Sequence, residues 1–298
     1  HLKGLKNMHI VNAKGILSAQ NGINIYRGCS HGCIYCDSRS KCYQMSHSFE
    51  DIEVKANAAQ LLENALKRKR KPCMIGTGAM SDPYIPLEKN LCNMRKCLEI
   101  IDKYGFGVSI LTKSNLILRD LDLLKSINQK TKVVVQITLT TYNEKLCKIL
   151  EPNVSTSYER FKVLEIMRDN CIPTIVWLDP ILPFINDTEE NIRGILSYCE
   201  KAKVRGIMCF GMGLTLRTGN REYFYKKLDE HFPNLKERYI QKYGNRYEVT
   251  SSKNKELMQI LISFCRKLGI MYNIDEIFSY LSEFKQSENE QLNFFDML

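Results

Sequence analysis

Three cysteines lie within eight residues and could bind a metal centre together. Cys29, Cys33 and Cys36 stand in the stretch INIYRGCSHGCIYC, with the spacing C-x3-C-x2-C. Iron–sulfur clusters are bound by cysteine thiolates at close spacing. Three thiolates leave one iron of a [4Fe–4S] cluster free to bind another molecule. The spacing therefore favours such a cluster.

Zinc is the alternative that the same cysteines leave open. A structural zinc ion takes four ligands, usually as two spaced pairs. The sequence offers no matching second pair, but three further side chains could complete a set: Cys42 and either His31 or His47.

The composition is that of an ordinary folded protein with a basic balance. The chain has 298 residues, 44% of them hydrophobic and 26% charged, and a net charge of +10. The charge favours an anionic partner, of which nucleic acid is the common case. No apolar run could span a bilayer and no signal-peptide pattern opens the sequence. We therefore expect a cytoplasmic protein without a membrane contact, whose twelve cysteines are mostly buried thiols rather than disulfides.

A strand followed by an amphipathic helix recurs six times along the chain. Such a series indicates a parallel sheet with helices outside. We predict an α/β fold, a partial (β/α)6 TIM-type barrel over residues 14–222. A helical C-terminal extension over 223–286 and a flexible tail over 287–298 would follow. The six predicted strands are Ile23–Tyr26, Cys73–Thr77, Gly107–Thr112, Lys132–Thr140, Thr174–Leu178 and Gly206–Phe210.

The fourth predicted strand, VVVQITLTT, has one face that turns polar toward its C-terminal end. Val133, Val135 and Ile137 share an apolar face suited to helices, whereas Gln136 and Thr138 lie on the other. A strand buried between two apolar layers should be apolar on both faces. The inner face should therefore line a ligand site at the C-terminal ends of the strands, where sites of βα barrels gather.

These features together resemble the radical S-adenosylmethionine (SAM) superfamily. The stretches IYRGCSHGCIYC, GTGAMSDPYIPLE, ILTKS and EPNVSTSYER resemble its spore photoproduct lyase-like branch, whose members are often labelled DNA repair photolyases. The resemblance runs from about Lys14 to Phe210. It implies a [4Fe–4S] cluster on Cys29, Cys33 and Cys36 that cleaves SAM to methionine and a 5′-deoxyadenosyl radical, which takes hydrogen from the substrate.

The resemblance also implies a set of SAM-binding residues. Tyr35 would lie near the adenine. A Ser-Asp pair after the second strand, a lysine ending the third and a hydroxyl residue in the fourth would contact SAM. Arg160, together with Glu151, matches the branch's E-P-x-x-S-x5-R pattern, and it could equally form an ion pair at a helix start. The matching positions for the Ser-Asp pair, the lysine and the hydroxyl are Ser81, Asp82, Lys113 and Thr138.

Two positions depart from the lyase pattern. The lyase proper has a cysteine two residues before the Ser-Asp pair, which returns hydrogen to the substrate, and here that residue is Ala79. It also has a tyrosine after the third cluster cysteine, where this chain has Asp37. Cys73 and Cys209 could donate hydrogen instead, although core packing accounts for both more simply.

The segment GMGLTLRTGNREYFYKK follows the last predicted strand and could cover the barrel mouth. Arg217 and Arg221 could bind a phosphate there, whereas Tyr223 and Tyr225 fit an amphipathic helix that packs on the core. Further along, QLNFF in the tail resembles the short peptides that dock on the bacterial sliding clamp, and it could equally pack on its own domain. The docking residues would be Gln291, Leu292, Phe294 and Phe295.

Three functions fit the sequence. The first is a radical SAM enzyme acting on damaged DNA, with a flavodoxin or ferredoxin as electron donor. The second is a radical SAM enzyme acting on a peptide or a small metabolite. The third is an iron–sulfur or zinc adaptor without catalysis, docked on a sliding clamp through the tail.

Overall fold

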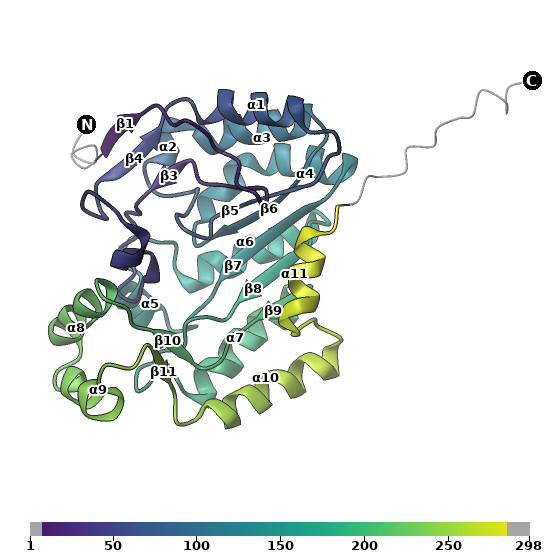
Figure 1. The fold of residues 1–298 in the computed structure, drawn as a ribbon. Coiled ribbons are helices and arrows are strands. Elements are labelled where there is room, and N and C mark those ends of the chain that lie inside the picture. The colour runs from purple at the N-terminus through teal and green to yellow at the C-terminus, as the bar shows by residue number, and fades with distance from the viewer. Residues whose placement is uncertain (1–7, 285–298) are drawn as a thin grey trace, which may run out of the picture.

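A six-stranded parallel sheet forms the centre of the computed structural model, which describes residues 8–284 (Figure 1). The strand order is β2-β5-β6-β7-β8-β9, so each strand lies beside the next in the chain. This is the arrangement of an open, partial βα barrel, and it confirms the predicted fold class. The strands are β2 (Gly22–Ile23), β5 (Met74–Thr77), β6 (Gly107–Thr112), β7 (Val133–Thr138), β8 (Thr174–Trp177) and β9 (Gly206–Met208).

The first predicted strand, Ile23–Tyr26, is divided between two sheets. Only β2 belongs to the parallel sheet, whereas β3 (Tyr26–Arg27) pairs antiparallel with β4 (Ile52–Lys55). β4 also pairs in parallel with β1 (Met8–Val11), which gives a second sheet of order β1-β4-β3. Where the chain passes from one sheet to the other, the buried Tyr26 hydroxyl donates a hydrogen bond to the Glu88 carboxylate. The sequence prediction missed this small sheet.

Helices cover the outer face of the parallel sheet, and their apolar sides form the main core with it (Figure 1). Buried side chains such as Leu62, Leu98 and Ile195 come from these helices and meet Val135 and Ile137 of β7. The covering helices are α1 (Ala58–Arg68), α2 (Glu88–Leu91), α3 (Asn93–Lys103), α4 (Leu121–Lys130), α6 (Ser157–Asp169), α7 (Glu189–Lys201) and α10 (Asn254–Leu268), which packs on α7. The short α5 (Glu144–Leu150) belongs instead to a second apolar cluster with Ile34 and Tyr35.

The inner face of the sheet changes from apolar to polar along the strands, as the β7 pattern predicted. At the N-terminal ends, α11 (Ile274–Ser282) crosses the sheet and packs Ile277 against Val134 and its inner-face neighbours. In the middle, the Gln136 amide donates to Ser109 Oγ at 2.8 Å and accepts from Trp177 Nε1 at 2.7 Å. Only the C-terminal ends of the strands are left open to a ligand.

A two-stranded antiparallel sheet and two helices lie beside this open end. β10 (Gly213–Thr215) pairs antiparallel with β11 (Glu248–Thr250), which comes from the segment expected to be a helical extension. Between them, α8 (Asn220–His231) and α9 (Leu235–Tyr243) form their own core with the residues before α6 and after β8. No helix of residues 8–284 is long and apolar enough to cross a membrane. The predicted clamp-docking residues lie outside the described part of the chain.

The position of α11 predicts unequal effects for two neighbouring residues. Ile277 is fully buried against the sheet, whereas Phe278 is 46% exposed. We expect Ile277→Ala to lower the free energy of unfolding by about 2–5 kcal/mol, since it leaves a cavity, and Phe278→Ala to change it by about 0.5 kcal/mol or less. Urea unfolding followed by circular dichroism measures both. Equal effects would show that α11 does not close the inner face.

Candidate active site

The cysteine loop follows β3 and is fixed by the chain on both of its sides. On one side, Cys29 N–H donates to the Phe49 carbonyl at 3.2 Å. Gly28 has a positive φ of 87°, and a Cβ there would lie 2.6 Å from that same carbonyl oxygen. Ser81 Oγ donates to the Gly28 carbonyl at 2.6 Å. Only glycine fits this turn, which brings the first cysteine into the protein.

The other side of the loop is held by the segment EPN that the sequence resemblance pointed to. Ile34 N–H donates to the Leu150 carbonyl at 2.9 Å, and Asn153 N–H donates to the His31 carbonyl at 3.1 Å. The Asn153 side chain donates to the Ser30 carbonyl at 2.9 Å. The motif therefore serves as a support for the cysteine loop.

The three thiols fit a cluster better than a single ion. Burial raises the pKa of Cys29 to about 12, with further contributions from the charges of Asp82 and Cys36. Burial also raises the pKa of Cys33, which the charge of Lys113 partly opposes. Such thiols become thiolates only when a metal centre replaces their protons.

The spacing of possible ligand atoms separates the two kinds of centre. Zinc–sulfur bonds of about 2.3 Å bring the sulfurs of a tetrahedral site to within about 4 Å of one another. Within residues 8–284, no set of three potential ligand residues that includes a cysteine brings its ligand atoms within 4.8 Å. A cluster that uses one thiolate per iron spreads its ligands further apart. The geometry supports the cluster and disfavours the closed zinc site.

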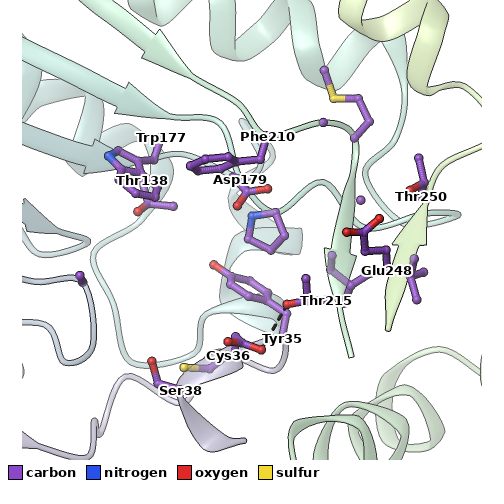
Figure 2. Close-up of a pocket in the computed structure, with 18 of the residues that line it drawn as sticks. Tyr35, Cys36, Ser38, Thr138, Trp177, Asp179, Phe210, Thr215, Glu248 and Thr250 are labelled. Carbon is purple, nitrogen blue, oxygen red and sulfur yellow. Dashed lines mark hydrogen bonds between the residues drawn. The ribbon is translucent and has the colours of Figure 1, made fainter. Parts of the chain in front are cut away.

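A cavity of about 640 Å³ opens next to Cys36 at the C-terminal ends of the strands (Figure 2). Of the predicted SAM contacts, Tyr35, Lys113 and Thr138 line it. Further lining residues come from the segment after Cys36, the strand ends, the paired strands β10 and β11, and the start of α10: Asp37, Ser38, Ala79, Trp177, Asp179, Phe210, Thr215, Glu248, Thr250 and Asn254.

Lys113 is a half-buried cation at the cavity wall. Its Nζ donates to Thr138 Oγ1 at 3.3 Å, so the two predicted contacts lie together. Burial alone would lower the pKa of the ammonium, but the negative charges of Cys33, Glu151 and Asp82 outweigh it and raise the pKa. Lys113 therefore stays charged and can meet a carboxylate.

Behind Tyr35 lies a buried ion pair. The Tyr35 hydroxyl donates to the Glu151 carboxylate, which also accepts from the Arg160 guanidinium. Arg160 donates to the Thr138 carbonyl at 2.7 Å and is fully buried. Burial alone would raise the pKa of Glu151, but Arg160 and Lys113 hold it below the ordinary value. Arg160 does not line the cavity, so the structure places it as a support for Tyr35 and Thr138.

Ser81 and Asp82 are also placed behind the cavity wall. Ser81 is engaged with the cysteine loop, as described above. Asp82 accepts from Thr112 Oγ1 at 2.7 Å and from Lys113 N–H at 2.8 Å. Both side chains are buried. The Ser-Asp pair thus ties the cysteine loop to the end of β6 and orients Lys113.

The two candidate hydrogen donors lie away from the cavity. Cys73 precedes β5, at the opposite end of the sheet from the strand ends that line the cavity. Cys209 follows β9, but its thiol is buried 3.7 Å from Met258 Sδ. Neither residue lines the cavity, whereas Ala79 and Asp37 both do. Within the described lining, Cys36 is the only cysteine.

The two candidate phosphate-binding arginines have different surroundings. Arg221 donates to four backbone carbonyls, those of Leu216 and of residues 244–246, so it fixes the turn after α9. Arg217 is 35% exposed and lies 3.6 Å from the cavity residue Asp37. Its guanidinium also donates to Tyr247 Oη at 2.5 Å. Arg217 therefore lies at the cavity rim and Arg221 does not.

Asp179 is a cavity residue that the sequence analysis missed. It follows β8 directly and its carboxylate points into the space below Phe210 (Figure 2). Burial raises its pKa to about 7, and Lys113 partly opposes this. The strand-end rule could have found it, because the dipeptide Asp179-Pro180 directly follows the fifth predicted strand, Thr174–Leu178. Glu248 and Thr250 could not have been found that way, since they reach the cavity through the pairing of β11 with β10, which is distant in sequence.

The comparisons with known proteins agree with this geometry. Residues 23–199 match the family model of the Radical SAM superfamily. The chain belongs to the radical SAM superfamily. Members of this family use a [4Fe–4S] cluster and SAM. An uncharacterized protein of Mycobacterium tuberculosis is 30% identical over 234 residues, which are 74% of this chain and 66% of that protein. The chain thus spans just under two thirds of that relative. An uncharacterized protein of Methanocaldococcus jannaschii is 33% identical over 181 residues, 60% of this chain and 67% of that protein.

Among solved structures, the fold is similar to that of spore photoproduct lyase. A cysteine-to-serine mutant of the lyase superposes with a TM-score of 0.65 over 89% of this chain and 81% of that one, at 14% identity. The lyase complexed with a dinucleoside spore photoproduct gives a TM-score of 0.62 at 15% identity over the same shares. Identity at this level shows a shared fold.

The raised pKa of Asp179 predicts a pH-dependent stability. In the unfolded chain its pKa falls to its ordinary value of 3.8, so the carboxyl's contribution to stability is full below about pH 4 and is lost as the pH rises through about 7. Asp179→Asn removes this loss. We expect the variant to gain stability relative to the wild type between pH 4 and pH 8, by an amount on the order of a few kcal/mol. Urea unfolding across this pH range, without SAM, measures it.

Glu248→Gln is the matched control, because Glu248 lines the same cavity but is exposed. This control should follow the wild type at every pH. If Asp179→Asn also followed the wild type throughout, the carboxyl would not be desolvated as the structure indicates.

Proposed function

We propose that this radical SAM enzyme acts on nucleic acid, and on damaged DNA in particular. The observation that carries the proposal is a row of three aromatic side chains that leads out of the cavity: Trp177, Phe210 and Phe278. The ring centres of Trp177 and Phe210 lie 5.8 Å apart, and those of Phe210 and Phe278 lie 6.4 Å apart.

The row is exposed where a substrate would enter. Phe210 is 53% exposed and Phe278 is 46% exposed. Contact of neighbouring aromatic rings with water is unfavourable unless a partner covers them. Unpaired bases stack on such rings. The net charge of +10 favours an anionic substrate. The structural similarity to a lyase that was solved with a dinucleoside photoproduct supports the same substrate class.

The residues around the cavity are suited to hold SAM beside the cluster. When bound and reduced, the cluster on Cys29, Cys33 and Cys36 supplies the cleavage of SAM that yields a 5′-deoxyadenosyl radical. Lys113 and Thr138 would bind the charged and polar groups of SAM at the ends of β6 and β7. The buried pair of Glu151 and Arg160 would keep Tyr35 and the Thr138 carbonyl in place.

The reaction that follows hydrogen abstraction differs from that of the lyase proper. No cysteine stands at the position of Ala79, and the two candidate donors, Cys73 and Cys209, do not reach the cavity. Within residues 8–284, no thiol other than that of the proposed cluster ligand Cys36 lines the cavity and could return hydrogen to the substrate. We infer that any hydrogen returned to a substrate radical comes from a donor other than a thiol at position 79, so the last step differs from that of the lyase.

Cleavage of SAM tests the enzymatic part of the proposal. Anaerobically reconstituted protein that is incubated with SAM and dithionite should form 5′-deoxyadenosine, which mass spectrometry detects. Cys33→Ala should lose both this product and the cluster absorbance, because only three thiolates are available to hold the cluster and the variant lacks one of them. Cys171→Ala, which removes an exposed thiol far along the chain, should retain both. A fully reconstituted wild type without 5′-deoxyadenosine would overturn the proposal.

Binding of single-stranded DNA tests the substrate class. We expect Phe210→Ala and Phe278→Ala each to weaken binding of a short oligonucleotide by about 5- to 100-fold, as lost base stacking costs about 1–3 kcal/mol. Fluorescence anisotropy at one fixed salt concentration measures this. Tyr158→Ala removes a 49% exposed aromatic ring from the outer helix α6 and should have no effect. Equal binding by all three variants would favour a peptide or small-molecule substrate.

A further inference from the structure

A second group of potential metal ligands lies in the small N-terminal sheet, away from the cavity. One ligand atom each of His9, His47 and Glu53 lies within 4.8 Å of the other two, and no other such group occurs within residues 8–284. His9 on β1 and Glu53 on β4 are register partners in neighbouring strands, so their side chains share a face. His47 comes from the loop before β4 and adds the third ligand.

The two imidazoles already have one ring nitrogen occupied. His47 Nδ1 lies 3.0 Å from the Ser48 carbonyl, and His9 Nδ1 lies 3.0 Å from an Asp51 carboxylate oxygen. A carbonyl can only accept, so the proton of neutral His47 is on Nδ1 and the lone pair is on Nε2. A carboxylate holds His9 in the same tautomer. Histidine ligands of metal ions are usually oriented by such second partners.

The free nitrogen of His47 has no partner that explains its burial. Its Nε2 is shielded from solvent and has no hydrogen bond among the described residues. The closest carboxylate oxygen, from Glu53, is 3.7 Å away. Hydrogen bonds of this kind are about 2.7–3.2 Å long. Two ligands at about 2.0–2.1 Å from one tetrahedral ion lie about 3.4 Å apart, which is closer to the observed separation.

We propose that His9, His47 and Glu53 bind a divalent transition-metal ion, with Asp51 orienting His9. Two imidazoles and one carboxylate form a donor set that zinc accepts, with a fourth position for water. The ion would join β1, β4 and the loop of residues 47–51. The Phe49 carbonyl of this loop holds Cys29 N–H, so the ion would also stiffen one support of the cysteine loop.

Zinc uptake by the cluster-loaded protein tests the site. Reconstituted, desalted protein is dialysed against buffered Zn²⁺, and bound zinc is measured by plasma mass spectrometry. The wild type should take up one zinc ion more than Glu53→Gln or His47→Ala. Asp51→Asn should weaken the affinity by about 10- to 100-fold, because it removes only the orienting partner. His231→Ala is the control, since it removes a histidine on α8 whose side chain is 38% exposed; it should bind zinc like the wild type.

Two further measurements keep the result independent of folding and of the cysteines. Zinc should raise the melting temperature of the wild type and of His231→Ala, but not that of Glu53→Gln, which keeps the size of the side chain. X-ray absorption at the zinc edge should show nitrogen and oxygen ligands without sulfur. Equal zinc uptake by all variants, or zinc bound by sulfur alone, would overturn the proposal. Cleavage of SAM does not enter any of these readouts.

Discussion

The candidate active site depends on one buried ion pair. Glu151 and Arg160 are both inaccessible to solvent, so each would be costly to bury without the other. The pair connects Tyr35 on the cysteine loop with the Thr138 carbonyl at the end of β7. The loop that carries the proposed cluster ligands and the strand ends proposed to bind SAM are thereby held in one frame. An active site that holds a cluster and a sulfonium compound at a fixed separation needs such a connection. The protein must provide it, because neither group can position these residues before binding.

The location of the cavity follows from how the inner face of the sheet is filled. α11 covers the N-terminal ends, where Val134 and Ile277 meet, and the Gln136 network fills the middle. Space remains only at the C-terminal ends, beside the antiparallel pair of β10 and β11. The polar side chains of β7 are therefore not a defect of a buried strand. They lie where the packed part of the inner face ends and the cavity begins.

Much of this could be predicted from the sequence, and the limits have physical causes. Strand positions and the polar inner face of β7 follow from period-two patterns, and Lys113 and Thr138 follow from the strand-end rule. The β1-β4-β3 sheet was missed because its strands are only two to four residues long, too short for a period-two pattern such as that of β4 to be recognised, and because they pair over long separations. The positions of Ser81, Asp82 and Arg160 behind the wall could not be deduced either. A motif specifies which residues occur together, but side-chain hydrogen bonds decide which of them face the ligand.

Under the proposed function, the departures at Ala79 and Asp37 separate two structural demands, which are generating a radical and quenching it. Generation requires three thiols, a charged lysine and a supported loop, which engage residues from Cys29 to Arg160. Quenching by the lyase route requires one thiol at one position of the cavity wall. Replacement of that thiol by alanine leaves every hydrogen bond of the cysteine loop in place. A change of reaction outcome therefore costs the fold little, whereas a change in the radical-generating frame would remove buried partners that the whole site shares.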